Sequence, residues 1–160
     1  LRMDVKLKAK TKNTDLNLNK MSRKAIFLYV KNFLLKQGRP SKELNQPRRA
    51  RARGQPPREP GQCYYRMPYL GRTLKCAVGC LIPESKYSYN LEGYSLTSTG
   101  TVQAVLQVSE AKRLMLKQLQ DIHDNAPTNP DGSFLMDDLM KSLSELWTAT
   151  FGEFPSWNQK

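Results

Sequence analysis

The chain has 160 residues, of which 39% are hydrophobic, so it can form one domain of modest core and still leave segments unfolded. It carries 26 Lys and Arg against 14 Asp and Glu, a formal net charge of +12. No run approaches the roughly eighteen apolar residues of a membrane span, and residues 1–20 lack the apolar core of a secretory signal. We therefore expect a cytoplasmic protein with no membrane partner, whose three cysteines are reduced thiols.

The positive charge is concentrated in the first third of the sequence. Residues 1–30 carry eight Lys or Arg and two acidic residues, residues 31–58 carry nine and one, and residues 59–160 carry nine and eleven. We expect this charge to belong to a disordered basic tail over residues 1–21 and to one loop, with the folded body close to neutral. Two interpretations of residues 1–20 are open: a basic extension of the protein, or sequence upstream of a translation start at Met21.

The first predicted helix covers residues 23–37. Its apolar residues recur at helical spacing, Ser22 can cap its N-terminus, and Gly38 can end it. Residues 46–62 follow, with four prolines and five arginines. Proline removes backbone donors and like charges repel, so we expect a disordered Arg- and Pro-rich insertion within the domain.

A small β-hairpin and a buried turn are expected next. Residues 63–65 and 72–76 can form two short strands. The apolar run 77–82 is poor in β-branched residues and is followed by proline, which favours a short helical turn buried on all sides. Residues 84–101 are rich in Tyr, Ser, Thr and Gly, and we expect an ordered irregular connection with a brief strand near residues 94–96.

Two further helices are predicted in the last third of the chain. One ends before Pro127 and begins near Thr101 or at Ser109; the other is capped by Ser133 and ends at Gly152. The expected fold class is therefore α+β and α-rich, with about three main helices around a hairpin and a buried turn. The single domain spans residues 22–152, and residues 153–160 form a loose tail.

The cysteines and the single histidine are the candidates for a metal site. Cys76 and Cys80 lie four residues apart and would share one face of a helical turn, and Cys63 can approach from the hairpin. With His123 these residues have the composition of a Cys₃His zinc site. The apolar neighbours of Cys76 and Cys80 favour buried thiols in the core instead, and we expect no cofactor.

A nucleophilic cysteine paired with His123 is the enzymatic alternative. Asp121 or Asp124 could orient the imidazole of His123, as an acid does in a catalytic triad. The competing interpretation is structural, because a histidine in the last turn of a helix can bind the free carbonyls there.

Aromatic and basic side chains alternate at the predicted hairpin, in Tyr64, Tyr65, Arg66 and Arg72. Tyrosine can stack on a base while arginine binds a phosphate, so these residues are candidates for single-stranded nucleic-acid binding. The same pattern suits a half-buried hairpin.

The motifs QGRPS, CYYR, KCAVGCLIPESKY, LEGYS and LQDIHDNAP occur in this order along the chain. Together they resemble a family of small uncharacterised proteins found largely in tailed bacteriophages and in bacterial genomes carrying prophages. The resemblance covers residues 26–41 and 63–146, while the insertion 46–62 departs from the family pattern. It implies a compact accessory protein made in the cytoplasm of the bacterial host cell, and it brings no reaction or binding residue with it.

Three hypotheses about function follow. The first is a non-enzymatic phage or prophage accessory protein that binds a host or phage macromolecule, either a protein or a nucleic acid. The second is a cysteine- or metal-dependent enzyme that uses Cys76 or Cys80 with His123. The third is nonspecific nucleic-acid binding through the basic tail and loop.

Overall fold

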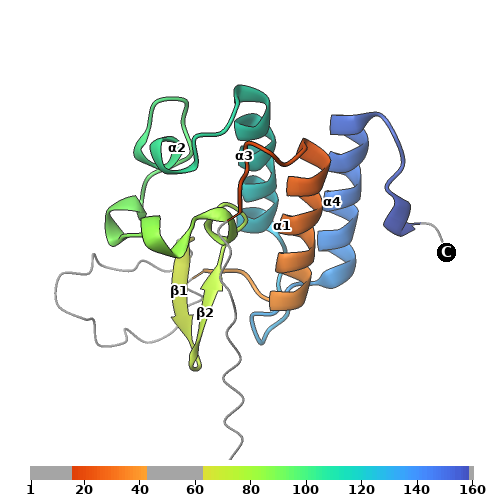
Figure 1. Ribbon diagram of the computed structural model, residues 1–160. Coiled ribbons are helices and arrows are strands. Elements are labelled where there is room, and N and C mark those ends of the chain that lie inside the picture. The colour runs from red at the N-terminus through yellow and green to blue at the C-terminus, as the bar shows by residue number, and fades with distance from the viewer. Residues whose placement is uncertain (1–15, 43–62, 159–160) are drawn as a thin grey trace, which may run out of the picture.

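The computed structural model describes residues 16–42 and 63–158. Over these residues the fold is α+β and rich in helix, with four α-helices and one antiparallel two-stranded hairpin (Figure 1). The helices are α1 (Arg23–Gln37), α2 (Thr101–Leu106), α3 (Glu110–Asn125) and α4 (Met136–Phe151), and the strands are β1 (Arg66–Tyr69) and β2 (Arg72–Lys75). Single 3₁₀ turns are η1 (Gly79–Leu81), η2 (Glu84–Lys86), η3 (Tyr89–Leu91) and η4 (Ser156–Asn158). The expected fold class is confirmed.

Helix α1 has the predicted limits because local groups satisfy both of its ends. The Ser22 hydroxyl accepts a hydrogen bond from the backbone N–H of Ala25 at 3.1 Å. Gly38 takes a left-handed φ of +77° and donates its N–H to the carbonyl of Leu34. The buried side of α1 carries Ile26, Phe27, Val30 and Leu34.

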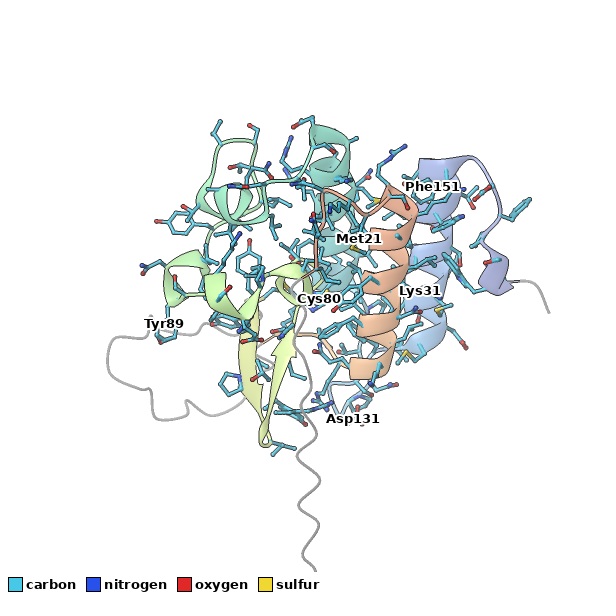
Figure 2. All side chains as sticks on the ribbon, viewed as in Figure 1. Met21, Lys31, Cys80, Tyr89, Asp131 and Phe151 are labelled. Carbon is cyan, nitrogen blue, oxygen red and sulfur yellow. The ribbon has the colours of Figure 1, made fainter. Side chains whose placement is uncertain are left out.

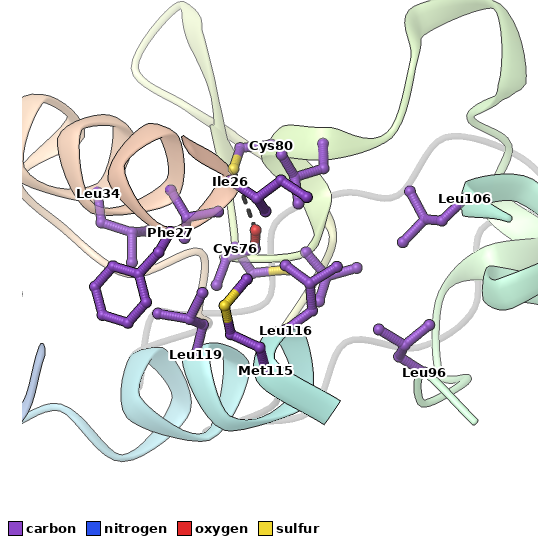
Figure 3. Close-up of a cluster of buried hydrophobic side chains, with 14 of the residues drawn as sticks. Ile26, Phe27, Leu34, Cys76, Cys80, Leu96, Leu106, Met115, Leu116 and Leu119 are labelled. Atoms are coloured by element: carbon purple, nitrogen blue, oxygen red, sulfur yellow. Dashed lines mark hydrogen bonds between the residues drawn. The ribbon is translucent and has the colours of Figure 1, made fainter. Parts of the chain in front are cut away.

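The core lies where α1, α3 and α4 meet the η1 turn. Figure 3 shows the part of it that lies between α1, α3 and this turn. Met115, Leu116 and Leu119 of α3 are at most 2% exposed and contribute to the cluster that includes the buried face of α1. Residues 76–82 of the turn are all buried, as predicted. A side chain at Gly79 would overlap the carbonyl of Tyr65, so the close approach of turn and hairpin requires glycine there.

The hairpin begins three residues later than predicted. Its two-residue turn fixes the pairing from Tyr69 with Arg72 to Arg66 with Lys75, which leaves Cys63 outside the ladder in an isolated bridge with Lys42. The backbone N–H groups of Tyr65 and Arg66 bind the Glu92 carboxylate instead of a second strand. No strand forms at residues 94–96.

The second predicted helix is two helices, and each of the two predicted starts begins one of them. Helix α2 begins at Thr101 and ends at Leu106, with Gln107 as its C-cap at a φ of +52°. Helix α3 then begins with Ser109 as its cap. The prediction that Ser133 caps α4 is wrong: Ser133 binds the Asp131 carboxylate in the preceding turn, and Leu135 occupies the cap position.

Residues 153–158 are not a loose tail. Trp157 contacts Phe27 and Trp147, and its indole N–H donates to Ser144 at 3.2 Å. At the other end, Leu18 belongs to the core with 5% exposure, which contradicts the prediction of a disordered tail that extends to residue 21. The rest of the predicted tail and the insertion 46–62 lie outside the described residues.

The folded domain is more basic than expected. Residues 16–42 carry seven Lys or Arg and no acidic residue, and residues 63–158 carry eight against ten. The seven positive charges belong to α1 and its flanks, which pack against the rest of the domain. A large share of the basicity is therefore held on a fixed surface.

Leu70 offers a test of backbone strain at the hairpin turn. It has a φ of +44° and is 74% exposed, so a branched side chain occupies a left-handed position that asparagine tolerates better. Leu70→Asn is expected to raise the free energy of unfolding by about 1 kcal/mol in chemical denaturation. The control is Leu114→Asn in α3, where asparagine should lower it by about 0.5 kcal/mol. A loss of stability in both variants would show that the backbone at Leu70 is not strained.

Candidate functional site

Two of the candidate metal residues, Cys63 and His123, meet Asp124 at the end of α3. Cys63, His123 and Asp124 place one ligand atom each within 4.8 Å of the others, and they form the one such group of His, Cys, Asp and Glu side chains in the described part of the chain. The buried face of α3 carries His123 toward the core. Cys63 is held near His123 by its β-bridge with Lys42 and by the hydrogen bond from the Tyr64 N–H to the Ser41 carbonyl.

Cys76 and Cys80 are not part of this group. Cys76 is 1% exposed, and its sulfur accepts the N–H of Gly79. Cys80 is 7% exposed, and its thiol donates to the carbonyl of Ala77. Burial raises the pKa of Cys76 well above its ordinary value and that of Cys80 to about 12. Both residues belong to the core around η1, as the apolar sequence context favours.

The imidazole of His123 is fully buried, and both of its nitrogens are engaged. The backbone N–H of Ser41 donates to Nε2 at 3.0 Å, and Nδ1 lies 2.8 Å from the Asp124 carboxylate. Because a backbone N–H can only donate, Nε2 carries no proton. The proton is therefore on Nδ1, the ring is neutral, and Nδ1–H donates to Asp124.

Asp124 is the acceptor at the centre of the group. Its carboxylate accepts hydrogen bonds from His123, from the Gln120 amide at 2.5 Å and from the Cys63 thiol. Burial alone would raise the pKa of Asp124, but these hydrogen bonds outweigh it and hold the pKa below its ordinary value. Burial, with the negative charge of Asp124 as a second cause, raises the pKa of Cys63 to about 12.

This order of groups does not form a catalytic triad. In a triad the histidine lies between nucleophile and acid and takes the proton of the nucleophile. Here Asp124 lies between Cys63 and His123, and the free lone pair of the imidazole is given to Ser41. A thiol with a pKa of about 12 also has little thiolate at neutral pH. The geometry therefore does not activate Cys63 as a nucleophile.

The group does not fit a metal ion either. A metal bound at Nδ1 would displace the proton there, while the Ser41 N–H requires that Nε2 also lack one. The imidazole would then have to become an anion, whereas metal-bound histidine normally keeps a proton on its second nitrogen. Cys63, His123 and Asp124 are better described as a closed hydrogen-bond network.

A cleft of about 500 Å³ opens beside this network. Residues 93–96 and the outer side of α3 form its walls, and Cys63, Asp124 and Lys42 contribute to its lining. The Lys42 ammonium donates to the Asp124 carbonyl at 3.2 Å. The sequence reasoning did not find this cleft, because it is formed by segments that lie far apart in the chain.

The candidate nucleic-acid residues have separate environments. Tyr64 and Tyr65 are 5% and 8% exposed, and the Tyr65 hydroxyl donates to the carbonyl of Tyr94, so neither ring is open for stacking on a base. Arg66 pairs with Glu84 at 2.6 Å. Arg72 is exposed.

Comparison with known proteins does not assign the chain to a group. No family model, no curated protein and no solved structure gives a significant match. Among the helices in residues 16–42 and 63–158, none has the length and apolar character needed to cross a bilayer.

Asp124→Asn should test the charge of the network through pH. A carboxylate whose pKa is lowered by folding stabilises the protein above its unfolded pKa of about 3.9, and this contribution disappears as the pH falls through the lower folded pKa. The wild type should therefore be more stable than the variant at about pH 7, with a difference that narrows below about pH 4. Urea denaturation across this range measures the difference.

The matched control is Asp121→Asn, one turn earlier on the exposed side of α3. Asp121→Asn should change the free energy of unfolding only slightly, and this change should not depend on pH in the way expected for Asp124→Asn. A stability difference for Asp124→Asn that stays constant down to low pH would show that the charge of Asp124 does not stabilise the fold.

Proposed function

We propose that this protein is a non-enzymatic accessory protein of the phage or prophage type that acts by binding a host or phage macromolecule. The observation that carries the proposal is positive charge on a fixed surface with few carboxylates beside it among the described residues. Lys31 is buried over Trp157, and of the six other basic residues between residues 16 and 42, Lys24 is the one with a carboxylate within 4.0 Å in the described part of the chain. Surface charge held without partners attracts an acidic molecule over long distances.

The polar network at the end of α3 supports binding over catalysis. His123, Asp124 and Cys63 satisfy one another and Ser41, so that no group in the network is left to move a proton or attack a substrate. Cys76 and Cys80, the thiols of the enzymatic alternative, are buried and bonded to the backbone of their own turn. These features favour a structural role for the residues that could otherwise supply chemistry.

Thiol alkylation tests the absence of an activated cysteine. In the folded protein near neutral pH, iodoacetamide should modify all three cysteines far more slowly than it modifies a free thiol, because the pKa values are raised and two of the thiols are buried. In urea all three should react at the ordinary rate. Mass spectrometry after timed quenching gives the rates. Rapid modification of Cys63 in the folded protein would favour the enzymatic alternative.

The binding function itself is tested with the full chain. The protein is cross-linked in extracts of phage-infected bacteria, the partner is identified, and the complex is re-formed from purified components. A defined dissociation constant is the supporting result. Turnover of a substrate that is lost in His123→Gln or Cys63→Ser, with no re-formed complex, would overturn the proposal.

A further inference from the structure

The tip of the hairpin is an energetically unusual part of the surface. Leu70 occupies the first central position of the turn with a φ of +44°, and Gly71 follows with a φ of +76°. Two-residue hairpin turns with two positive φ values favour Asn-Gly, since asparagine adopts this backbone more easily than leucine. Leu70 also leaves 74% of its surface in water. The residue therefore carries both strain and exposed apolar area, and neither is offset within the described residues.

Two arginines are held beside this leucine. The guanidinium carbons of Arg39 and Arg72 lie 4.1 and 5.8 Å from the ring centre of Tyr69. Their N–H groups donate to backbone carbonyls, Arg39 to Asp131 at 2.7 Å and Arg72 to Gln37 at 3.5 Å. In residues 16–42 and 63–158, neither guanidinium has a carboxylate within 4.0 Å. Both positive charges are thus positioned without being neutralised.

The surroundings of the tip offset this charge only in part. The carboxylate of Asp131 lies near enough to Arg39 for the arginine to contribute to lowering its pKa, but its hydrogen bonds go to the hydroxyl and N–H of Ser133. The hairpin projects from the helices, and the turn that carries Asp131 lies at the same end of the molecule (Figures 1 and 2). Within residues 16–42 and 63–158, the apolar apex and the two arginines beside the neighbouring Tyr69 are accordingly open to a partner.

The side chains at the hairpin tip favour double-stranded DNA over single-stranded nucleic acid as the acidic partner. Single-stranded nucleic acid is usually held by open aromatic rings, but Tyr64 and Tyr65 are buried and Tyr69 is already in contact with the arginines. Proteins that bind the DNA minor groove instead insert an apolar side chain such as leucine between base steps, while arginines bind the groove or phosphates. The minor groove is about 6 Å wide, so it admits an inserted side chain such as that of Leu70 and not the two-stranded hairpin itself.

We infer that the hairpin tip is a docking surface for double-stranded DNA, with Leu70 entering the minor groove and Arg39 and Arg72 contacting the adjacent phosphates. This inference rests on the proposed function, since it names the partner class and the contact surface. Strain and exposure at Leu70 are then retained because they place an apolar wedge at the apex. The positive flank of α1 adds attraction to the same polyanion.

The experiment uses the full chain and a fluorescent A·T-rich DNA duplex, with anisotropy measured over a range of salt concentrations. Leu70→Asn should weaken binding by about tenfold, because it removes an apolar side chain from a buried contact. The same variant is expected to be more stable than the wild type, so weaker binding cannot be a result of unfolding. Arg72→Gln should weaken binding and reduce the slope of affinity against salt by about one unit.

The matched control is Lys141→Gln on the exposed side of α4, which removes the same charge away from the hairpin. It should change the affinity much less than Arg72→Gln. Duplex RNA, whose minor groove is wide and shallow, and single-stranded DNA should both bind more weakly than the DNA duplex.

Three outcomes would overturn the inference. Equal DNA affinity for the wild type, Leu70→Asn and Arg72→Gln would place the contact elsewhere and leave the proposed function intact. Equal affinity for duplex RNA or single-stranded DNA would remove the minor groove as the binding site. Failure of the wild type to bind the DNA duplex at low salt would exclude DNA as the partner, while the proposed function would still be decided by the complex re-formed from purified components.

Discussion

The hydrogen bond from the Ser41 N–H to the buried imidazole of His123 is the interaction on which the arrangement of this fold depends. It joins Ser41 to α3 although 82 residues separate the two positions in the chain. The network continues through Asp124 to Gln120, whose side-chain carbonyl accepts the N–H of Val78 at 3.0 Å in the buried turn. The Ser41 hydroxyl also donates to the carbonyl of Leu74 in β2. A buried polar group without a partner lowers the stability by about 1–3 kcal/mol. Moving any one of these segments would leave polar groups of the others without partners, so the network fixes their relative positions.

This network also explains how the fold accommodates a long segment between Lys42 and Cys63. Lys42 and Cys63 are bridged to each other, and the Tyr64 N–H binds the Ser41 carbonyl, so both ends of the intervening segment are fixed by groups outside it. The entropy of closing a loop grows only slowly with its length. The residues between positions 42 and 63 can therefore be numerous and polar without altering the packing of His123.

The sequence predicts the features that local chemistry determines. The limits of α1 follow from Ser22 and Gly38, which satisfy the helix ends within a few residues, and the buried turn follows from an apolar run that proline truncates. Features that need a distant partner were missed. Strand β1 begins at Arg66 and not at the predicted Cys63, because Glu92 binds the N–H groups of Tyr65 and Arg66. The position of Trp157 depends on Phe27, which is distant in the sequence.

The same distinction applies to the candidate site. That Asp124 could orient His123 follows from their adjacency in the sequence, and the structure selects Asp124 over Asp121. The role of Ser41 has no local signal, because its part is played by a backbone N–H that every residue but proline possesses. Without that bond, the cysteines and the histidine suggest a metal or catalytic centre. With it, the imidazole has no lone pair left for either function.

The placement of reactive and charged groups in this fold favours the proposed binding function over catalysis. The thiols and the imidazole, which are the most reactive side chains, are buried and bonded to neighbours. At the surface, two arginines beside Tyr69 have no carboxylate within 4.0 Å among the described residues, and the apex of the hairpin is strained. A sequence that satisfies its local preferences at both ends of α1 but breaks them at an exposed turn retains that strain most readily when a partner offsets it. The surface of the hairpin, and not the core, therefore carries the features that favour binding.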